Sequence, residues 1–218
     1  MSTRLYMKQH DYPGKLITFC GLDGCGKSTM IEMLREDLSN SGCDVLITKQ
    51  PTDSMRTTDI FRSYMDSPDH GKNRYRALSL MAAADRIQHI NQMILPALRE
   101  GKIVICDRYI YSCLANLRAR GYEEDDWIYE ISREEIPAPD LAFFLEVPVD
   151  TAVARVRERP QEKDRYIDMG LQYRLYEQYR KICRENDGVL ISSDTDKLLT
   201  YSKLLKYVEK HLGGHKNG

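Results

Sequence analysis

The sequence predicts an α/β fold in which helices flank a parallel β-sheet. Four short runs, at residues 16–20, 102–106, 141–147 and 188–192, are almost continuously apolar and rich in β-branched or aromatic residues. Such runs are typical of strands that are covered on both faces. Residues 44–48 form a weaker fifth candidate. Helical patterns separate these runs, and a glycine-rich turn follows the first of them, so strands and helices alternate as a parallel sheet requires.

The predicted helices fill the stretches between the strands. The longest pattern repeats apolar side chains at helical spacing but contains Pro96, at which we expect the helix to kink or end. We expect the first dozen residues and residues 213–218 to be frayed. The predicted helices cover residues 27–40, 75–99, 149–159, 171–185 and 195–212.

Length and composition indicate one globular domain. The chain has 218 residues, of which 42% are hydrophobic and 30% charged. This composition is that of a folded chain rather than a disordered one. The sequence contains no internal repeat and no interdomain linker, so we expect a single domain over residues 1–218 with its core at about 15–212.

Charge, hydropathy and cysteine spacing argue against several classes of partner. The net charge of −1 gives no overall attraction for nucleic acid or an anionic membrane. No apolar run approaches the ~18 residues of a transmembrane helix, and the first residues lack the apolar stretch of a signal peptide. The six cysteines form neither a CxxC pair nor a zinc pattern. We therefore expect a cytoplasmic protein with free thiols and with neither a nucleic-acid nor a membrane partner.

The glycine-rich turn after the first predicted strand has the pattern of a phosphate-binding loop. Residues 21–29 read GLDGCGKST and contain G-x-x-x-x-G-K-S between a strand and a helix. Glycines let successive backbone N–H groups point at an anion, and the following helix offers the positive end of its dipole. Lys27 supplies a cation for the β- and γ-phosphates, Ser28 supplies a hydroxyl for Mg²⁺, and Cys25 only has to be small. The predicted ATP site comprises Gly21, Gly24, Cys25, Gly26, Lys27, Ser28 and Thr29.

Asp23 is an unusual residue inside this loop. A carboxylate among phosphate-binding amides would repel the phosphate unless it faces another ligand. We expect Asp23 to point away from the phosphate, toward an acceptor hydroxyl or a Mg²⁺-bound water. The alternative is a structural role in which it accepts a backbone N–H in a turn.

A second carboxylate ends another predicted strand, where Asp107 and Arg108 follow residues 102–106. Ligands of open parallel sheets bind at the carboxyl ends of the strands, so both side chains should lie beside the phosphate loop. Asp107 would then hold Mg²⁺ directly or through water, and Arg108 would suit a second phosphate. The alternative is an Asp helix cap followed by a solvated Arg.

Several segments, taken together, resemble the thymidylate kinase family of P-loop nucleoside monophosphate kinases. The phosphate loop is followed, in the order typical of that family, by ADRIQH at residues 84–89, by residues 101–109 and by PDL at residues 139–141. The resemblance runs from about residue 15 to 193. It implies a P-loop kinase fold with a five-stranded parallel sheet, often a homodimer. It also implies phosphoryl transfer from Mg-ATP to a nucleoside monophosphate, usually dTMP.

The resemblance implies roles for the matched residues. Asp23 would contact the acceptor sugar or the metal region, Arg86 the base edge, and Arg108 the acceptor phosphate. Asp107 would support the metal together with Ser28. The same resemblance adds three more residues to the acceptor site, namely Tyr109, Ser112 and Asn116.

A mobile lid is implied at about residues 155–168, where positive charge is concentrated. Phosphoryl transfer needs cations around the equatorial oxygens of the transferred group. Some thymidylate kinases carry such an arginine in the phosphate loop, at the position of Gly24 here, so lid arginines would have to supply it. We favour Arg159 and Arg165 as catalytic residues, together with Lys27 and Arg108, and expect Arg155 to lie nearer the adenine. The alternative is a solvated, charged helix end.

The sequence departs from the family pattern around the acceptor base. The family usually places a stacking Phe where this chain has Ala82, and often reads Ala-Tyr-Gln where it has Ala115-Asn116-Leu117. Gln50 stands where a carboxylate is usual. Because a stacked aromatic contributes on the order of 1 kcal/mol beyond its buried area, we hypothesise an acceptor other than dTMP or relaxed specificity.

Three functions are compatible with these motifs. The first is a nucleoside monophosphate kinase with dTMP as its default acceptor. The second is a kinase of the same scaffold that acts on another nucleoside monophosphate or small phosphorylated molecule. The third is a regulatory protein that binds ATP without turnover, against which the intact Lys27, Ser28, Asp107 and Arg108 argue.

Overall fold

The fold is taken from a computed structural model that describes residues 2–69 and 73–212. Five strands form one sheet in the order β2-β3-β1-β4-β5, and every pairing is parallel. Each strand end lies within one residue of its prediction, so the predicted α/β fold is confirmed. The strands are β1 (Lys15–Cys20), β2 (Val45–Lys49), β3 (Ile103–Asp107), β4 (Leu141–Glu146) and β5 (Val189–Ser192).

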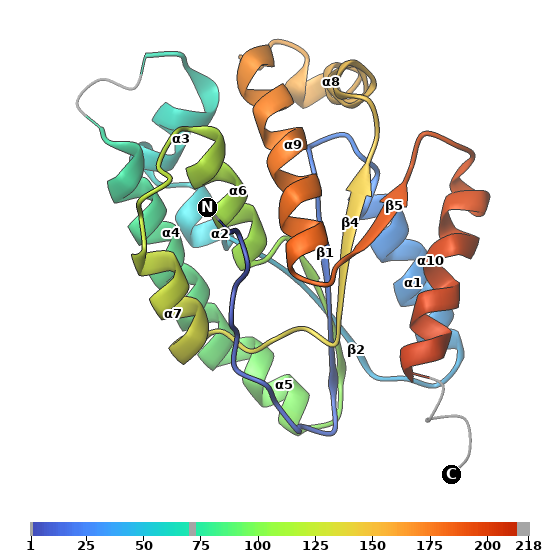
Figure 1. Cartoon of the computed structure of the whole chain (residues 1–218). Helices are drawn as coiled ribbons and strands as arrows, with labels where there is room; N and C mark the ends of the chain where they lie inside the picture. The colour runs from blue at the N-terminus through green and yellow to red at the C-terminus, as the bar shows by residue number, and fades with distance from the viewer. Residues whose placement is uncertain (1, 70–72, 213–218) are drawn as a thin grey trace.

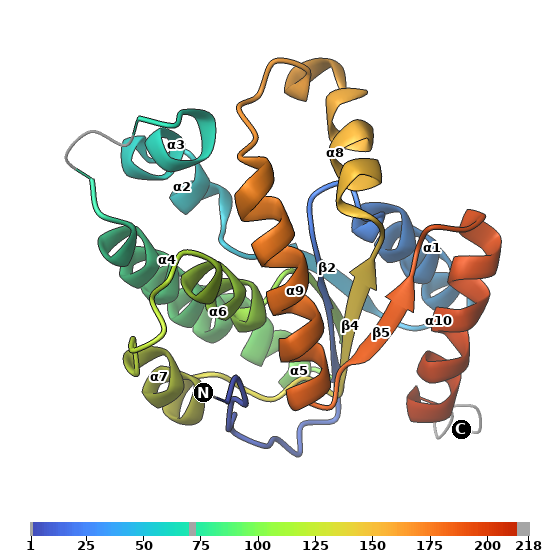
Figure 2. The ribbon, with the colours of Figure 1, turned by 45° about the horizontal axis from the view of Figure 1, so that its top comes forward.

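Helices cover both faces of this sheet. Figure 1 shows α1 and α10 on one face and α4, α6 and α9 on the other, and Figure 2 shows the same layers from a second direction. The helices are α1 (Lys27–Asn40), α2 (Asp53–Arg56), α3 (Asp59–Asp66), α4 (Tyr75–His89), α5 (Leu95–Arg99), α6 (Ile110–Ala119), α7 (Trp127–Glu135), α8 (Val149–Arg157), α9 (Met169–Glu185) and α10 (Lys197–Leu212). In the described residues, no helix is both long and apolar enough to span a bilayer.

The hydrophobic core lies between the central strands and these helices. Within the sheet, Phe19 of β1 packs on Phe143 of the neighbouring strand β4 with ring centroids 5.2 Å apart. Tyr111 of α6 packs on Phe144 of β4 at 5.3 Å. Side chains on both faces of the central strands are almost completely buried, which explains why their sequence is apolar without alternation.

The helical stretch at residues 75–99 continues through Pro96. A π-helical turn (Ile90–Ile94) joins α4 to α5, and the N–H of Leu95 donates to the carbonyl of Ile90, five residues earlier. A proline ring normally presses on the carbonyl four residues before it. The wider turn relieves this contact just before Pro96, so the helix neither breaks nor ends there.

The N-terminal segment is ordered, contrary to our expectation of fraying. Thr3 and Leu5 are buried, and the N–H of Leu5 donates to Oδ1 of Asn186 at 2.7 Å. The Thr3 N–H donates to the Glu185 carboxylate. The polar end of α9 therefore binds this segment, a long-range contact that no local pattern indicates. The other stretch expected to fray, residues 213–218, lies outside the described residues.

Two short helices that no pattern indicated, α2 and α3, connect β2 to α4. The second begins at Thr58, whose hydroxyl oxygen accepts the N–H of Phe61 at 3.3 Å. In Figures 1 and 2 these helices and α8 lie beyond the carboxyl ends of the strands. Helices therefore lie beyond that edge of the sheet on both sides.

Candidate functional site

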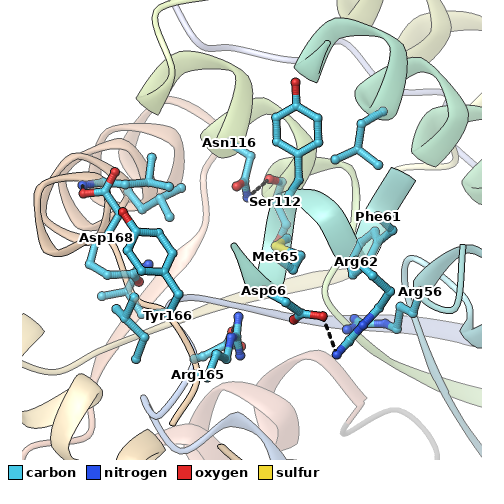
Figure 3. Close-up of a pocket in the computed structure, with 18 of the residues that line it drawn as sticks. Arg56, Phe61, Arg62, Met65, Asp66, Ser112, Asn116, Arg165, Tyr166 and Asp168 are labelled. Carbon is cyan, nitrogen blue, oxygen red and sulfur yellow. Dashed lines mark hydrogen bonds and ion pairs between the residues drawn. The ribbon is translucent and has the colours of Figure 1, made fainter. Parts of the chain in front are cut away.

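A cavity of about 930 Å³ opens at the carboxyl ends of the strands. Its walls come from α2 and α3 on one side and from the segment before α9 on the other, with α4 and α6 between them. Figure 3 shows Phe61 and Met65 opposite Tyr166 and Asp168 across this space. The cavity therefore lies where ligands of open parallel sheets bind.

The phosphate loop borders this cavity and has the backbone that its sequence predicts. Gly21, Gly24 and Gly26 all have positive φ, with 83° at Gly24. A Cβ added at Gly24 would lie 2.1 Å from the carbonyl oxygen of Ala152, so the loop packs directly against the backbone of α8. This contact leaves no room for a side chain at Gly24 and requires glycine on steric as well as conformational grounds.

Lys27 is buried behind the loop. Its ammonium group donates to the carbonyl oxygens of Leu22 at 2.8 Å and Gly21 at 3.3 Å. Ser28 and Thr29 are exposed in the first turn of α1, and Gly26 precedes that helix. Cys25 is buried, as a small residue that only fills space would be. The loop thus presents a cation, hydroxyls and a helix N-terminus at one point.

Asp107 and Arg108 reach the same edge of the sheet. Oδ1 of Asp107 is buried and has no hydrogen-bond partner. The cap residue of α6 is Tyr109, and the Arg108 side chain is only 15% exposed. The alternative of an aspartate cap with a solvated arginine is therefore wrong, because the chain turns inward at this strand end.

Asp23 pairs with two arginines. Its carboxylate lies 2.6 Å from Nη2 of Arg108 and 3.4 Å from Nη2 of Arg165. Burial by itself would raise the pKa of Asp23, but the charges of Arg108, Lys27 and Arg165 outweigh burial and hold that pKa well below its usual range. The side-chain partners of Asp23 are these cations rather than a backbone N–H, and its expected contact with a ligand stays a prediction. The carboxylate links the loop, a strand end and the predicted lid.

Arg108 is held in place from several directions. Nη1 donates to the carbonyl of Gly21 at 3.2 Å and to the hydroxyl of Tyr179 at 2.9 Å. That hydroxyl in turn donates to Oγ of Ser112 at 3.1 Å. Burial disfavours the charge of Arg108, but Tyr179 and Asp23 raise its pKa well above the usual range. Tyr179 comes from the middle of α9, and the sequence carried no signal for its role.

The remaining predicted acceptor residues divide into two groups. Arg86 and Asn116 line the cavity together with Ser112. Arg86 is buried, and its Nε has no hydrogen-bond partner. Tyr109, by contrast, is fully buried away from the cavity, and its hydroxyl donates to the carbonyl of Pro137 at 2.8 Å. The expected direct contact of Tyr109 with the acceptor is therefore wrong in this structure, because its side chain turns into the core.

The predicted lid arginines occupy three different environments. Arg165 lines the cavity and contacts both Asp23 and Glu162, the latter at 3.0 Å. Arg159 lines the cavity but is exposed. Arg155 lies apart, with its guanidinium donating to the carbonyl of Ser193 at 3.4 Å. Only Arg165 contacts the loop carboxylate among these three residues.

The wall near Ala82 contains aromatic residues that sequence reasoning did not assign to the site. Phe61, Tyr64 and Tyr75 line the cavity together with Ala82. Phe61 and Tyr64 lie on α3, and the cavity-lining Arg56 ends α2. Because these helices are short and follow no long repeat, no sequence pattern indicated that they line the cavity. Tertiary packing thus adds aromatic surface to the same cavity that Ala82 lines.

Comparison with known proteins identifies the family. The thymidylate kinase model matches residues 19–201. The probable thymidylate kinase of Pyrococcus horikoshii is 43% identical over 148 residues, which cover 67% of this chain and 71% of the relative. That of Thermococcus kodakarensis is 33% identical over 199 residues, or 88% of this chain and 96% of the relative. The thymidylate kinase of a Geobacillus strain is 34% identical over 190 residues, or 84% and 90%. This chain belongs to the thymidylate kinase family.

Proposed function

We propose that the phosphate loop holds ATP while the 930 Å³ cavity holds dTMP, so that the two substrates meet at Asp23. The family reaction is the ATP-dependent phosphorylation of dTMP to dTDP. The observation that carries the assignment of sites is that Asp23 and Leu22 belong to the phosphate loop and also line the cavity. Donor and acceptor sites therefore share a border, as direct transfer between two bound substrates requires.

On the donor side, the loop amides and Lys27 bind the ATP phosphates. Lys27 would exchange its contacts with the carbonyls of Gly21 and Leu22 for phosphate oxygens. The adenine would lie toward Arg155, which does not line the cavity and donates to the carbonyl of Ser193. Transfer to a phosphate acceptor needs little covalent help from the protein, so these contacts position and neutralise charge.

The residues present also fit Mg²⁺. The buried, unpartnered Oδ1 of Asp107 and the exposed hydroxyl of Ser28 are oxygen ligands of the kind that Mg²⁺ prefers. In the described residues, no group of three or more His, Cys, Asp or Glu side chains could hold a metal by itself. This suits Mg²⁺, which usually keeps several waters and binds through substrate phosphates. Bound there, the ion would neutralise the charge that develops on the ATP phosphates.

On the acceptor side, Arg108 binds the phosphate of dTMP and Arg86 the base edge. The unpartnered Nε of Arg86 is a donor that awaits an acceptor atom. Asp23 faces the acceptor sugar once Arg108 turns to the phosphate, and Ser112 and Asn116 form the wall beside it. Tyr109 supports this wall only indirectly, through its bond to Pro137.

The lid, at about residues 155–168, closes over both substrates. Since α8 blocks any side chain at Gly24, the cation for the transferred phosphoryl group comes from the lid. Arg165 already reaches Asp23 and is the stronger candidate, with Arg159 as its companion. Closure would exclude water and so prevent wasteful hydrolysis of ATP.

The experiment that tests this function is an ADP-release assay with Mg-ATP and a panel of ribo- and deoxynucleoside monophosphates. We expect kcat/KM for dTMP to exceed that for dUMP, UMP and CMP, because Phe61 and its aromatic neighbours give the wall near Ala82 an apolar face. Equal turnover with several acceptors would favour the relaxed specificity that Ala82 and Asn116 suggest. No ADP release with any acceptor would favour a regulatory ATP-binding protein.

We also propose that the protein works as a homodimer in the cytoplasm. Leu80, Met81 and Met93 are exposed along α4 and the π-helical turn, as large apolar side chains at an interface between copies would be. All six cysteines are free thiols, as a reducing compartment favours. Sedimentation equilibrium should give the mass of two chains, and a single-chain mass at micromolar concentration would contradict the dimer. Recovery outside the cytosolic fraction after cell fractionation would contradict the location.

A further inference from the structure

Arg120 is a cavity-lining guanidinium that the proposed function leaves unused. It directly follows α6, and its Nη1 donates to Oδ1 of Asn116 at 2.5 Å. Its guanidinium carbon lies 4.3 Å from the centre of the Tyr75 ring. Within residues 2–69 and 73–212, no carboxylate forms an ion pair with Arg120. Its half-buried charge is therefore held in place by neutral groups.

The cavity runs along α4 from Arg120 toward the proposed contact with the base. Tyr75, Ser79 and Ala82 line it, and their helical spacing places them on one face of α4. Tyr75 lies about 10 Å along the helix from Ala82. Nη1 of Arg86 donates to the carbonyl of Ala82 at 2.8 Å, so the proposed base contact lies at the other end of this face. A substituent that extends from the base past Ala82 would therefore approach Tyr75 and Arg120.

Small side chains keep this path open. Ala82 and Asn116 stand where the family usually or often has an aromatic ring, so both departures remove ring volume from the cavity. Oγ of Ser79 lies 3.4 Å from Sγ of Cys113, where small residues of α4 and α6 meet. Nδ2 of Asn116 donates to the carbonyl of Ser112 at 2.9 Å, which holds the amide against its own helix (Figure 3). The cavity of about 930 Å³ is near the upper end of the ~300–1,000 Å³ range of small-molecule sites and has room for an acceptor longer than dTMP.

We propose that the acceptor site also takes deoxyuridine monophosphates that carry a carboxylate on a flexible arm at position 5 of the base, and that Arg120 binds this carboxylate. This inference rests on the proposed function, in which the cavity takes dTMP and distinguishes it from dUMP by the 5-methyl group. The arm continues the direction of that methyl group past Ala82. A guanidinium has five N–H groups in a planar fork, and Asn116 accepts from Nη1 alone, so the remaining donors are available to a carboxylate.

The test measures binding of 5-(3-carboxypropyl)-dUMP and of its uncharged counterpart, 5-(3-carbamoylpropyl)-dUMP, by titration calorimetry in the absence of ATP. For the wild type, we expect the carboxylate to bind about 10-fold more tightly than the amide, because its hydrogen bonds to Arg120 are charge-assisted. In Arg120→Met this ratio of Kd values should fall to about one. The matched control, Arg62→Met, removes a cavity arginine that pairs with Asp66 at 2.6 Å and should leave the ratio unchanged.

A second variant tests the path of the arm. Ala82→Phe places a ring on the face of α4 between Arg86 and Tyr75, so it should raise the Kd of both long acceptors about 10-fold or more. The Kd of dTMP should rise much less, because its methyl group does not extend past position 82. Binding of dTMP also shows that the variant is folded.

Three outcomes would overturn the proposal. Equal Kd values for the carboxylate and the amide in the wild type would mean that no cation binds the arm, and an unchanged ratio in Arg120→Met would mean that another group binds it. Equal weakening of dTMP and the long acceptors by Ala82→Phe would mean that the arm does not pass this position. A wild type that phosphorylates dTMP but binds neither long acceptor would count against this inference alone, whereas one that binds all three but releases no ADP would count against the proposed function alone.

Discussion

Replacing Lys27 with methionine is expected to lower kcat for ADP formation by about 10³-fold or more, because the variant loses the buried cation that neutralises the ATP phosphates. Methionine keeps the length and most of the apolar volume of lysine. The variant also loses two hydrogen bonds to the buried carbonyls of Gly21 and Leu22, so a thermal melt is recorded to check that the fold is retained. Steady-state ADP release with dTMP at saturation measures the effect.

The control for this variant is Lys163→Met. Lys163 is an exposed lysine of the lid segment, so its loss removes the same charge without touching the loop. We expect kcat within about twofold of wild type, as for an ordinary surface substitution. Comparable turnover by Lys27→Met and wild type would contradict the assignment of the loop to ATP, whatever the acceptor.

Arg165→Met is expected to lower kcat by about 10²- to 10³-fold while changing the Kd of dTMP much less. The reason is that Arg165 reaches the border between the phosphate loop and the cavity, where it contacts Asp23 at 3.4 Å, and no side chain fits at Gly24 to replace it. A cation that acts on the transferred group stabilises the transition state more than the bound substrates. Single-turnover rates and dTMP binding, measured separately, distinguish these effects.

Two further arginines give this prediction its contrast. Arg159→Met should lower kcat by less than Arg165→Met, because Arg159 lines the cavity but is exposed. Arg157→Met is the control, since Arg157 is exposed on α8 and does not line the cavity. A loss of kcat at Arg159 that exceeds the loss at Arg165 would reverse the proposed roles, and unchanged kcat in all three variants would exclude the lid as the source of the cation.

The cavity contains aromatic side chains that the departure from the family pattern at Ala82 does not reveal. The absence of the family's stacking Phe at Ala82 predicts weaker binding of the acceptor base only if no other side chain fills the space of that ring. Phe61 and Tyr64 line the same cavity from α3, a helix of eight residues that the apolar pattern did not reveal. The packing of α3, and not position 82 alone, therefore determines the aromatic surface of the cavity.

The expectation for Tyr109 turned out wrong because neighbouring side chains at this strand end point in different directions. Tyr109 follows Arg108 directly in sequence, yet the Tyr109 side chain turns into the core while Arg108 lines the cavity. Arg108 has a φ of 68°, so the chain changes direction between these neighbours. The expected contact of Asp23 with an acceptor or a Mg²⁺-bound water stays a prediction, and its side-chain partners in the structure come from residues 85 and 142 positions away.

The sequence by itself determined the buried strands of a parallel sheet, the phosphate loop and the placement of Asp107 and Arg108 at a strand end. These features depend on short-range physics, namely the burial pattern of a few consecutive residues and the φ values that glycine permits. Tertiary structure alone decided that Asp23 joins two arginines, that Tyr179 holds Arg108, and that Arg56 and Phe61 line the cavity. Those contacts join side chains from distant elements, and their geometry exists only after the helices have packed on the sheet.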